Sequence, residues 1–407
     1  MFNNKSAIIY TLKNQISHLA IMINEEHVFD QKKELSRMVF TDVFQTFTNL
    51  AHLQFYFQDH YSYLPISAVD LPLSACYSSH IVCLNIKIFD FDVCYYLLDG
   101  RLSQIHTLIV NVQRIRQTSM VNKDKKIVSN LKCFSLISLR RTTVYDNLIV
   151  PFISQMFYLE KLVLSLIVYN RRTFVDGNSL VNDILSPMLY LHTFIFNIIT
   201  DGVRVLEELI SPPDVLSHAL VERGYDLDCY TDYNPLSRGQ YHIYSLPFVM
   251  DRIHIHSNKF PIGLFCTVRY LYVHDFIHPF EHEFFLRISQ CFPLLKEFVV
   301  FNPNPQKKKI TEEYQNEKTL VVAKFSYLIR LNLCGSYIDY TKQFLFDCNT
   351  CLPSLRTLHI NYEHLVMVTE NFANTAARTN CANLKRLIFD LQPMIYPENF
   401  FRYFPLL

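Results

Sequence analysis

The chain has 407 residues, half of them hydrophobic, and a formal net charge of +1. A chain of this length can bury a large core, either as two or three ordinary domains or as one elongated array. The balanced charge creates no long-range field, so we expect neither nucleic acid nor a membrane surface as a partner. Eleven scattered cysteines, without an amino-terminal basic and apolar segment, indicate a reduced protein of the cytoplasm or the nucleus.

A six-residue pattern, here called the apolar phrase, recurs along the chain. It has apolar residues at its first, fourth and sixth positions. In Leu355–Ile360 and Leu384–Phe389 it points three side chains of a short strand into one core. The middle apolar residue of each copy, here called the anchor, is separated from the next by 24 to 34 residues, apart from one gap of 77. This interval is close to the ~20 to 29 residues of a leucine-rich repeat. The anchors are Leu19, Leu53, Leu84, Leu108, Phe134, Leu162, Phe194, Leu271, Phe298, Leu331, Leu358 and Leu387.

The intervals between anchors have the apolar spacing of helices. The expected helices cover residues 30–44, 145–156, 179–185, 282–291, 340–347 and 363–377. Parallel strands follow, because each return to the next strand crosses through a helix. The sequence therefore predicts an α/β leucine-rich-repeat solenoid, or horseshoe, of about 12 to 13 irregular repeats. Its parallel strands would line the concave face and its helices the convex face.

The rhythm is interrupted between residues 200 and 240. Pro212-Pro213, Pro235 and several aspartates predict an irregular insertion or hinge there, between amino-terminal repeats at 1–199 and carboxy-terminal repeats at 241–407. Tyr241–Leu246 reads as a degraded repeat, with its anchor 28 residues before Leu271. The turn phrase Phe292–Leu295 recurs at Phe404–Leu407, which predicts a further strand from that point.

Strand positions between the inward-facing residues line the concave face of a solenoid, the surface that such proteins use for binding. Many are polar and neutral here, which suits hydrogen bonding to a protein surface or an extended peptide, although ordinary exposed strand residues have the same composition. Apolar residues hold equivalent positions elsewhere and would form a binding stripe or a second packed layer. These apolar residues are Ile109, Val163, Ile195, Val299 and Ile388. The candidate partner-binding residues are Gln54, Tyr56, Asn85, Lys87, Asn111, Ser165, Asn197, Tyr272, Asn332 and His359.

No catalytic, metal or cofactor site is predicted, and we expect the protein not to be an enzyme. Pro279 interrupts the helix that would pair His278 with His282, so the histidines from 254 to 282 are expected in ordinary surface and core positions. Cys348-Asn-Thr-Cys351 is a single CxxC without the second pair of a zinc ribbon. The sequence contains none of the motifs GxGxxG, HExxH and GxSxG.

Several phrases resemble the irregular F-box and leucine-rich-repeat proteins of the rotifer type. They are Leu98–Leu102, Asn130–Leu136, His282–Ile288 and Phe292–Lys296. In that family the F-box binds the Skp1 adaptor of a cullin ubiquitin ligase, and the repeats select the substrate. No F-box is recognisable in this sequence, because the first expected strand begins near Ile16.

The resemblance implies protein–protein interaction on the concave face, as the substrate-recognition part of a ubiquitin-ligase receptor, with a protein partner whose identity the sequence does not specify. A (β/α) barrel enzyme is one alternative, since strands and helices alternate with a similar period in that fold. An inert scaffold paralogue is the other.

Overall fold

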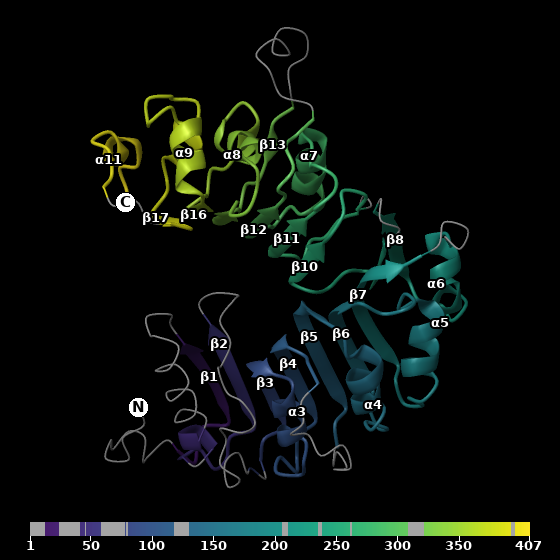
Figure 1. Ribbon diagram of the computed structural model, residues 1–407. Coiled ribbons are helices and arrows are strands. Elements are labelled where there is room, and N and C mark those ends of the chain that lie inside the picture. Colours follow the sequence, from purple (N-terminus) through teal and green to yellow (C-terminus); the bar gives the residue numbers. More distant parts are fainter. Residues whose placement is uncertain are drawn as a thin grey trace. The chain divides into compact units, whose positions relative to one another are not determined.

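The computed structural model describes residues 13–23, 41–44, 46–57, 78, 80–117, 130–205, 211–234, 238–260, 263–307, 321–391 and 395–407. The chain divides into two compact units, residues 1–245 (unit 1) and 246–407 (unit 2). Each unit contains a largely or wholly parallel sheet with short helices between its strands (Figure 1). The protein is therefore a mixed α/β protein, as the sequence predicts.

Unit 1 is organised around one large sheet with the strand order β1-β2-β3-β4-β5-β6-β7-β9-β8. Strands β1 to β7 pair in parallel and in chain order, whereas β9 pairs antiparallel with both β7 and β8. The strands are β1 (His18–Ile23), β2 (His52–Phe57), β3 (Cys83–Asp90), β4 (Thr107–Arg114), β5 (Cys133–Thr142), β6 (Lys161–Tyr169), β7 (Thr193–Arg204), β8 (Leu227–Tyr233) and β9 (Arg238–Ser245).

The predicted anchors of unit 1 lie opposite one another in a single row across the parallel strands. The row runs through Leu19, Leu53, Leu84, Leu108, Phe134, Leu162 and Phe194. From Leu53 to Phe194 these side chains are at most 4% exposed. Buried and half-buried residues alternate along β3 and β4, as expected for strands with one face in the core. The predicted parallel strands and inward-facing residues are confirmed in this unit.

Short helices carry the chain between the strands of unit 1. They are α3 (Asp92–Leu97), the π-helix η1 (Tyr145–Ile149), α4 (Val150–Ile153), α5 (Gly177–Leu180), the π-helix η2 (Val181–Leu185) and α6 (Pro213–Val221). Leu97 of α3 and Phe152 of α4 share one apolar core with the anchors, so these helices lie on the anchor side of the sheet. The helices predicted at 145–156 and 179–185 are confirmed, while that at 30–44 lies outside the described residues except for a helical stretch at 41–44.

The same tight turn introduces most strands. Three residues before an anchor, a buried residue donates its backbone N–H to the carbonyl three positions earlier, as Leu295 does to Phe292 at 3.2 Å. The Phe404–Leu407 phrase makes this turn as well, with a distance of 3.4 Å. The proline within both phrases fixes one backbone angle of the turn and prevents the preceding helix from continuing.

A repeated backbone contact fixes the stagger of neighbouring strands. Two residues before each anchor that is followed by another parallel strand, one backbone carbonyl accepts two N–H groups from the residues that lead into that next strand. In unit 1 the carbonyl of Lys132 accepts from Glu160 and Lys161 at 2.8 and 2.9 Å. In unit 2 that of Arg356 accepts from Lys385 and Arg386 at 2.8 and 3.1 Å. These contacts hold every anchor opposite the next one.

The long gap between anchors is filled differently from the prediction. Residues 200–240 include the end of β7, helix α6 and strand β8. The degraded parallel repeat expected at Tyr241–Leu246 is wrong, because β9 pairs antiparallel with its neighbours. A hairpin needs only a short connection and no crossover helix, so the helical period of the chain is lost here. The boundary between the units falls between Ser245 and Leu246.

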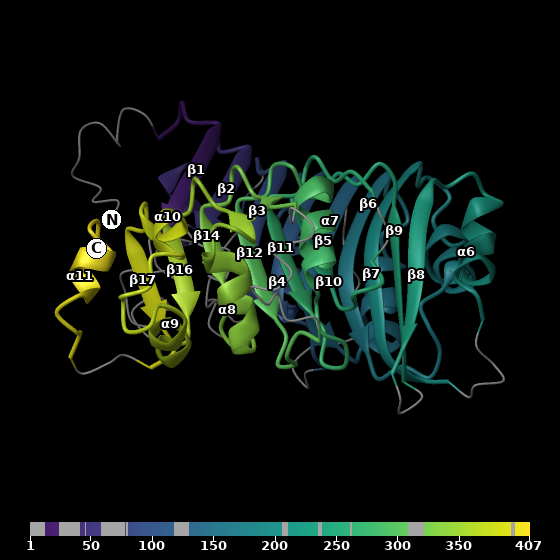
Figure 2. The same cartoon turned by 90° about the horizontal axis from the view of Figure 1, so that it is seen from above.

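Unit 2 has a six-stranded parallel sheet in the order β10-β11-β12-β14-β16-β17 (Figure 2). It also has a small parallel pair, β13 and β15. Its anchor row runs from Ile253, which was not among the expected anchors, through Leu271, Phe298, Leu331 and Leu358 to Leu387. The strands are β10 (Arg252–Ile255), β11 (Tyr270–His274), β12 (Glu297–Phe301), β13 (Ala323–Lys324), β14 (Arg330–Asn332), β15 (Thr350–Cys351), β16 (Thr357–Ile360) and β17 (Arg386–Phe389).

The helices of unit 2 follow the predicted spacing closely. They are α7 (His282–Cys291), α8 (Ile338–Leu345), α9 (Tyr362–Val368), α10 (Arg378–Cys381) and α11 (Phe400–Tyr403). Helix α7 has the predicted bounds, and α8 and α9 begin within two residues of theirs. The predicted end of the helix at 363–377 is wrong, because α9 ends at Val368 and the backbone then turns through positive φ angles at Glu370, Asn371 and Phe372.

Neither sheet closes on itself within the described residues. One sheet has β1 and β8 at its edges, and the other has β10 and β17. The alternative of a (β/α) barrel is therefore wrong for the described part of the chain, because a barrel requires a closed sheet. Among the described helices, none has both the length and the apolar character needed to cross a membrane.

Candidate functional site

The unit 1 sheet has a second face, directed away from the anchors, which we call the open strand face. Two rows of side chains cross it in register. One row consists of Gln54, Asn85, Ile109, Ser135, Val163 and Ile195. The other, two residues further along each strand, consists of Lys87, Asn111, Ile137, Ser165 and Asn197. Most of these side chains from β2 to β5 are half-buried, in contrast to the buried anchor row.

Four of the predicted partner-binding residues lie together on this face. Gln54 lies opposite Asn85, and Lys87 lies opposite Asn111, so their polar groups form one area on β2, β3 and β4. All four are half-buried and thus reach solvent. The side chain of Tyr56 lies outside the described residues. Ile109 adjoins Asn85 in the same row, which places apolar surface beside the polar groups.

Ser165 and Asn197, also predicted to bind a partner, are buried in a polar network. Asn197 Nδ2 donates to Ser165 Oγ at 3.0 Å, and Asn197 Oδ1 lies 2.7 Å from Nε2 of His242. Because an amide oxygen can only accept, Nε2 carries the ring proton. Nδ1 then accepts from the Tyr230 hydroxyl at 3.1 Å. Burial lowers the pKa of His242 to about 3, so the ring is neutral.

The two residues are unavailable to a partner because of the hairpin that follows β7. Strands β8 and β9 extend the sheet and bring Tyr230 and His242 beside Ser165 and Asn197. The sequence pattern does not reveal this pairing, since an antiparallel addition has no helical crossover to announce it.

The remaining predicted residues, Tyr272, Asn332 and His359, lie at the corresponding strand positions of unit 2. All three are half-buried. The Tyr272 ring is 4.7 Å from that of His254, while Asn332 lies opposite His359 on the neighbouring strand. His359 also belongs to a cluster of three side chains with different chemistry.

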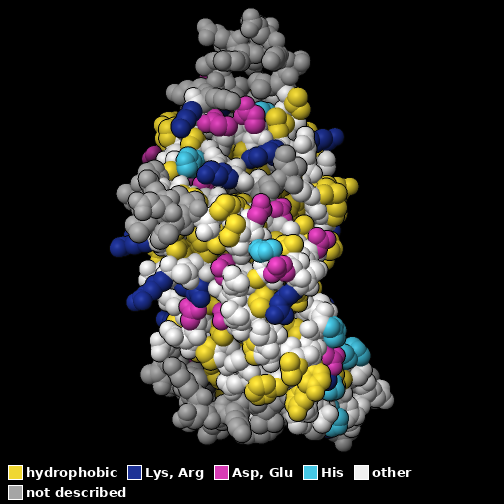
Figure 3. Space-filling view, turned by 90° about the vertical axis from the view of Figure 1, so that its right-hand side faces the viewer, with side chains coloured by type: hydrophobic (Ala, Val, Ile, Leu, Met, Phe, Trp, Pro, Cys, Tyr) yellow, Lys and Arg dark blue, Asp and Glu magenta, His cyan; other side chains and the backbone are white. Residues whose placement is uncertain are grey.

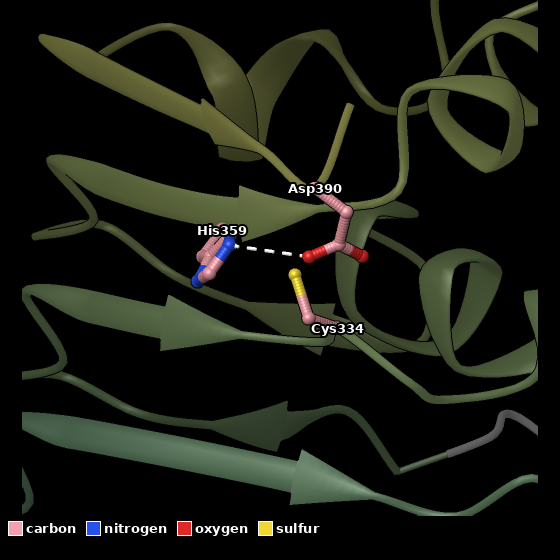
Figure 4. A group of neighbouring side chains, drawn as sticks. All are labelled: Cys334, His359 and Asp390. Atoms are coloured by element: carbon pink, nitrogen blue, oxygen red, sulfur yellow. Dashed lines mark ion pairs between the residues drawn. The ribbon is translucent and has the colours of Figure 1, made fainter. Parts of the chain in front are cut away.

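Cys334, His359 and Asp390 bring a thiol, an imidazole and a carboxylate together beside three successive strands of unit 2 (Figure 4). Cys334 follows β14, His359 lies in β16, and Asp390 follows β17. One ligand atom of each residue lies within 4.8 Å of the other two. Nε2 of His359 is 3.5 Å from Oδ1 of Asp390. The cluster thus offers sulfur, nitrogen and oxygen donors at one point.

The convergence of Cys334 and Asp390 depends on a residue between them. Neighbouring strands are about 4.8 Å apart, so side chains on β14 and β17 start about 10 Å apart. Asn361 occupies the intervening position on the β16 segment, but its Oδ1 caps helix α9 by accepting from the N–H groups of Glu363 and His364, at 2.9 and 3.2 Å. Its side chain is therefore engaged by its own helix, while the ligand atoms of Cys334 and Asp390 lie within 4.8 Å of each other.

The position of Cys334 is fixed by its own turn. Its backbone N–H donates to Asn332 Oδ1 at 2.9 Å, and the N–H of Leu333 donates to the carbonyl of His359 at 2.8 Å. Gly335 follows with φ +77°, and a Cβ there would overlap the Phe301 ring. Glycine is therefore required immediately after the thiol, because other residues rarely adopt this backbone conformation.

The surroundings do not activate this thiol as a nucleophile. Burial, followed by the hydrogen bond and the negative charge of Asp390, raises the pKa of Cys334. Burial lowers the pKa of His359 against the opposing effect of Asp390. A nucleophilic cysteine needs a neighbouring cation that lowers the thiol pKa. The cluster thus has ligand chemistry without the electrostatics of a cysteine–histidine catalytic pair.

Sequence reasoning found His359 but missed Cys334 and Asp390. Both stand three residues after an anchor, Leu331 and Leu387 respectively. This shared position was the available signal, since equal offsets from opposed anchors place residues at the same end of a parallel sheet. The convergence itself depends on the cap made by Asn361, which spacing alone does not reveal.

The histidines between residues 254 and 282 and the CxxC pair also lie in unit 2. The rings of His256 and His274 are 3.9 Å apart. His282 begins α7 and bonds Gln343 and the carbonyl of Val321, so His278 does not share its helix. Cys348 and Cys351 are both free thiols, the latter in β15.

Charged side chains of both signs are interspersed on the molecular face drawn in Figure 3. Charged side chains of opposite sign also pair directly in unit 1, for example Lys132 with Glu160 at 2.6 Å and Arg141 with Asp201 at 2.6 Å. That face therefore has no extended area of one charge, in keeping with the net charge of +1.

A scan against models of known protein families finds no match, and a search of curated proteins finds no significant match either.

Proposed function

We propose that the chain is an irregular leucine-rich-repeat protein that binds a protein partner on its open strand face. The regular stacking supports this proposal. In each unit the anchors form one row, the same turn precedes most strands, and the same carbonyl links each strand to the next. The proposal includes the finer description of a horseshoe-like solenoid, with the strands on its concave side.

The observation that carries the proposal is the largely parallel sheet of unit 1, whose described helices share one apolar core with the anchors on a single side of the sheet. Parallel sheets are usually buried on both faces and read as continuous apolar strands. Here β3 and β4 alternate between fully buried and half-buried side chains instead. Asn85 and Asn111 lie on the half-buried side, which would be an unusual place for amides unless that side meets water or a partner.

The chemistry of the open strand face suits a protein ligand. Amide groups both donate and accept hydrogen bonds, and they match the backbone and side-chain amides of a protein surface. The adjacent isoleucine and valine side chains, Ile109 and Val163, add apolar area. With little charge on this face, affinity would come from shape, apolar burial and hydrogen bonds.

The resemblance to F-box and leucine-rich-repeat proteins gives the proposal a specific form. In that form the repeats recognise a client protein for ubiquitination, with the Skp1–cullin machinery as a second partner. An inert scaffold differs in one measurable respect, because it would retain no client through this face.

The test makes the same kind of substitution, asparagine to arginine, on opposite sides of unit 1. Asn85→Arg and Asn111→Arg add bulk and charge to the open strand face, and each position is half-buried. Asn147→Arg makes the same change at an exposed position of η1, on the helix side. Affinity purification with mass spectrometry should recover a client with wild type and Asn147→Arg, and lose it with both face variants.

Circular dichroism and thermal unfolding of the three variants should match wild type, so that lost binding reports the surface. Recovery of Skp1 and cullin with the client would favour the ligase form. A client that survives both face substitutions but is lost with Asn147→Arg would contradict the proposal, and the absence of any specific client would favour the inert scaffold.

A further inference from the structure

We propose that Cys334, His359 and Asp390 form a binding site for one zinc-type divalent ion. The proposal is independent of the open strand face, because the cluster lies in unit 2. It starts from three different donor atoms that three successive strands bring within 4.8 Å of one another.

The spacing of the donors fits a tetrahedral metal centre. Zinc bonds of about 2.0 Å to nitrogen and oxygen, and about 2.3 Å to sulfur, place the ligand atoms of a tetrahedron about 3.3 to 3.6 Å apart. Nε2 of His359 and Oδ1 of Asp390 are 3.5 Å apart. A direct charge-assisted hydrogen bond would be shorter, about 2.7 to 2.9 Å. The His359–Asp390 separation therefore matches one edge of a metal tetrahedron, and the Cys334 sulfur lies within 4.8 Å of both atoms.

The donor types select the class of metal. Calcium and magnesium require oxygen ligands throughout, so a thiol and an imidazole exclude them. Thiolate, imidazole and carboxylate together suit zinc, which accepts all three and imposes no redox chemistry. Binding deprotonates the thiol, so the Cys334 proton leaves to solvent as the sulfur–metal bond forms.

Three protein ligands leave one tetrahedral position open. The side chains of His359 and Asp390 are 31% and 40% exposed, so this position faces solvent. Water would fill it in the isolated protein, as it does in zinc sites with three protein ligands. A carboxylate or imidazole of a bound molecule could replace that water.

Neighbouring groups already hold the ligands in place. Asn332 and Gly335 fix the turn that carries Cys334, and Asn361 caps α9 rather than filling the site. Such supporting contacts are typical around metal ligands, where they reduce the reorganisation that binding requires. The simpler alternative is an ion pair between His359 and Asp390 with a nearby thiol, and it predicts no response to zinc.

The first experiment uses the unmodified full-length chain. After chelator treatment, the protein is alkylated at its thiols with and without Zn²⁺, and each cysteine is followed by mass spectrometry. We expect Zn²⁺ to slow alkylation of Cys334 while leaving Cys266, an exposed cysteine of the same unit, unchanged. Equal rates for Cys334 with and without Zn²⁺ in molar excess would overturn the proposal.

The second experiment identifies the ligands. Co²⁺ added to the metal-free chain should give a thiolate-to-cobalt charge-transfer absorption band, which Cys334→Ser abolishes and Cys266→Ser retains. Zn²⁺ affinity, measured by competition, should fall at least ~10-fold in Cys334→Ser, His359→Ala and Asp390→Asn, because loss of a direct ligand costs no less than loss of a supporting group. Wild-type affinity in all three variants would place the metal elsewhere and refute the assignment.

Discussion

Buried His242 should make unit 1 sensitive to acid. Its pKa is lowered from 6.5 to about 3 by burial. The unfolded chain therefore binds the proton more tightly than the folded chain, and folding loses stability as the pH falls below about 6.5. Each unit of pH costs about 1.4 kcal/mol in this window, so the loss reaches about 3 kcal/mol at about pH 4. Above the ordinary histidine pKa this contribution to stability is fully present.

The prediction is tested by urea unfolding of wild type and His242→Gln across this pH range. Glutamine removes the titrating ring, so the variant should lack about 3 kcal/mol of the wild-type loss between about pH 7 and pH 4. Carboxyl groups such as Asp201 and Asp183, whose pKa values are raised by burial, act in the opposite direction. They are common to both proteins and cancel in the comparison.

His218→Gln is the matched control, because this residue is exposed on α6 and its ring is solvated in both states. It should retain the wild-type dependence on pH. Identical pH dependence in wild type and His242→Gln would show that the ring is not held neutral within the folded sheet.

Three further substitutions test the register and the packing of unit 2. Leu358→Ala removes an anchor with 0% exposure and should lower the free energy of unfolding by about 2 to 5 kcal/mol in urea titrations. His359→Ala, on the other face of the same strand, should lower it by less than about 1 kcal/mol. Equal losses for the two variants would mean that the two faces are reversed. Gly335→Ala should cost more than about 1 kcal/mol by the same measurement, because it requires φ +77° and meets the Phe301 ring, and an unchanged stability would refute the tight approach of these residues.

The sequence pattern predicts much of the fold because the apolar phrase contains both the strand and its orientation. Leu108, for example, points into the core and lies opposite Leu84 and Phe134, which are the anchors of the neighbouring strands. The phrase that locates one strand therefore also locates the strands beside it. The hairpin of β8 and β9 breaks this relation. Strand β10 carries the apolar phrase in Met250–Ile255, but Ile253 stands only 18 residues before Leu271, outside the interval of 24 to 34 residues between the other anchors. Short antiparallel or compressed connections carry no periodic signal.

The candidate sites were predictable to different degrees. Gln54, Asn85, Lys87 and Asn111 follow from strand alternation alone, because their exposure is decided within one strand. Ser165 and Asn197 depend on what pairs beyond β7, and the cluster around His359 depends on how two side chains lean across an intervening strand. Contacts of that kind arise between segments and have no counterpart in linear spacing.

The carbonyl that links each strand to the next has an evolutionary consequence. Since main-chain atoms make the bond, successive segments keep their alignment whatever side chains stand there. Insertions and deletions can accumulate in the returns without disturbing the row of anchors, whereas losing a single residue inside a strand would turn its inward side chains outward. Selection can therefore reshape the connecting segments freely while the strands are held to a strict count.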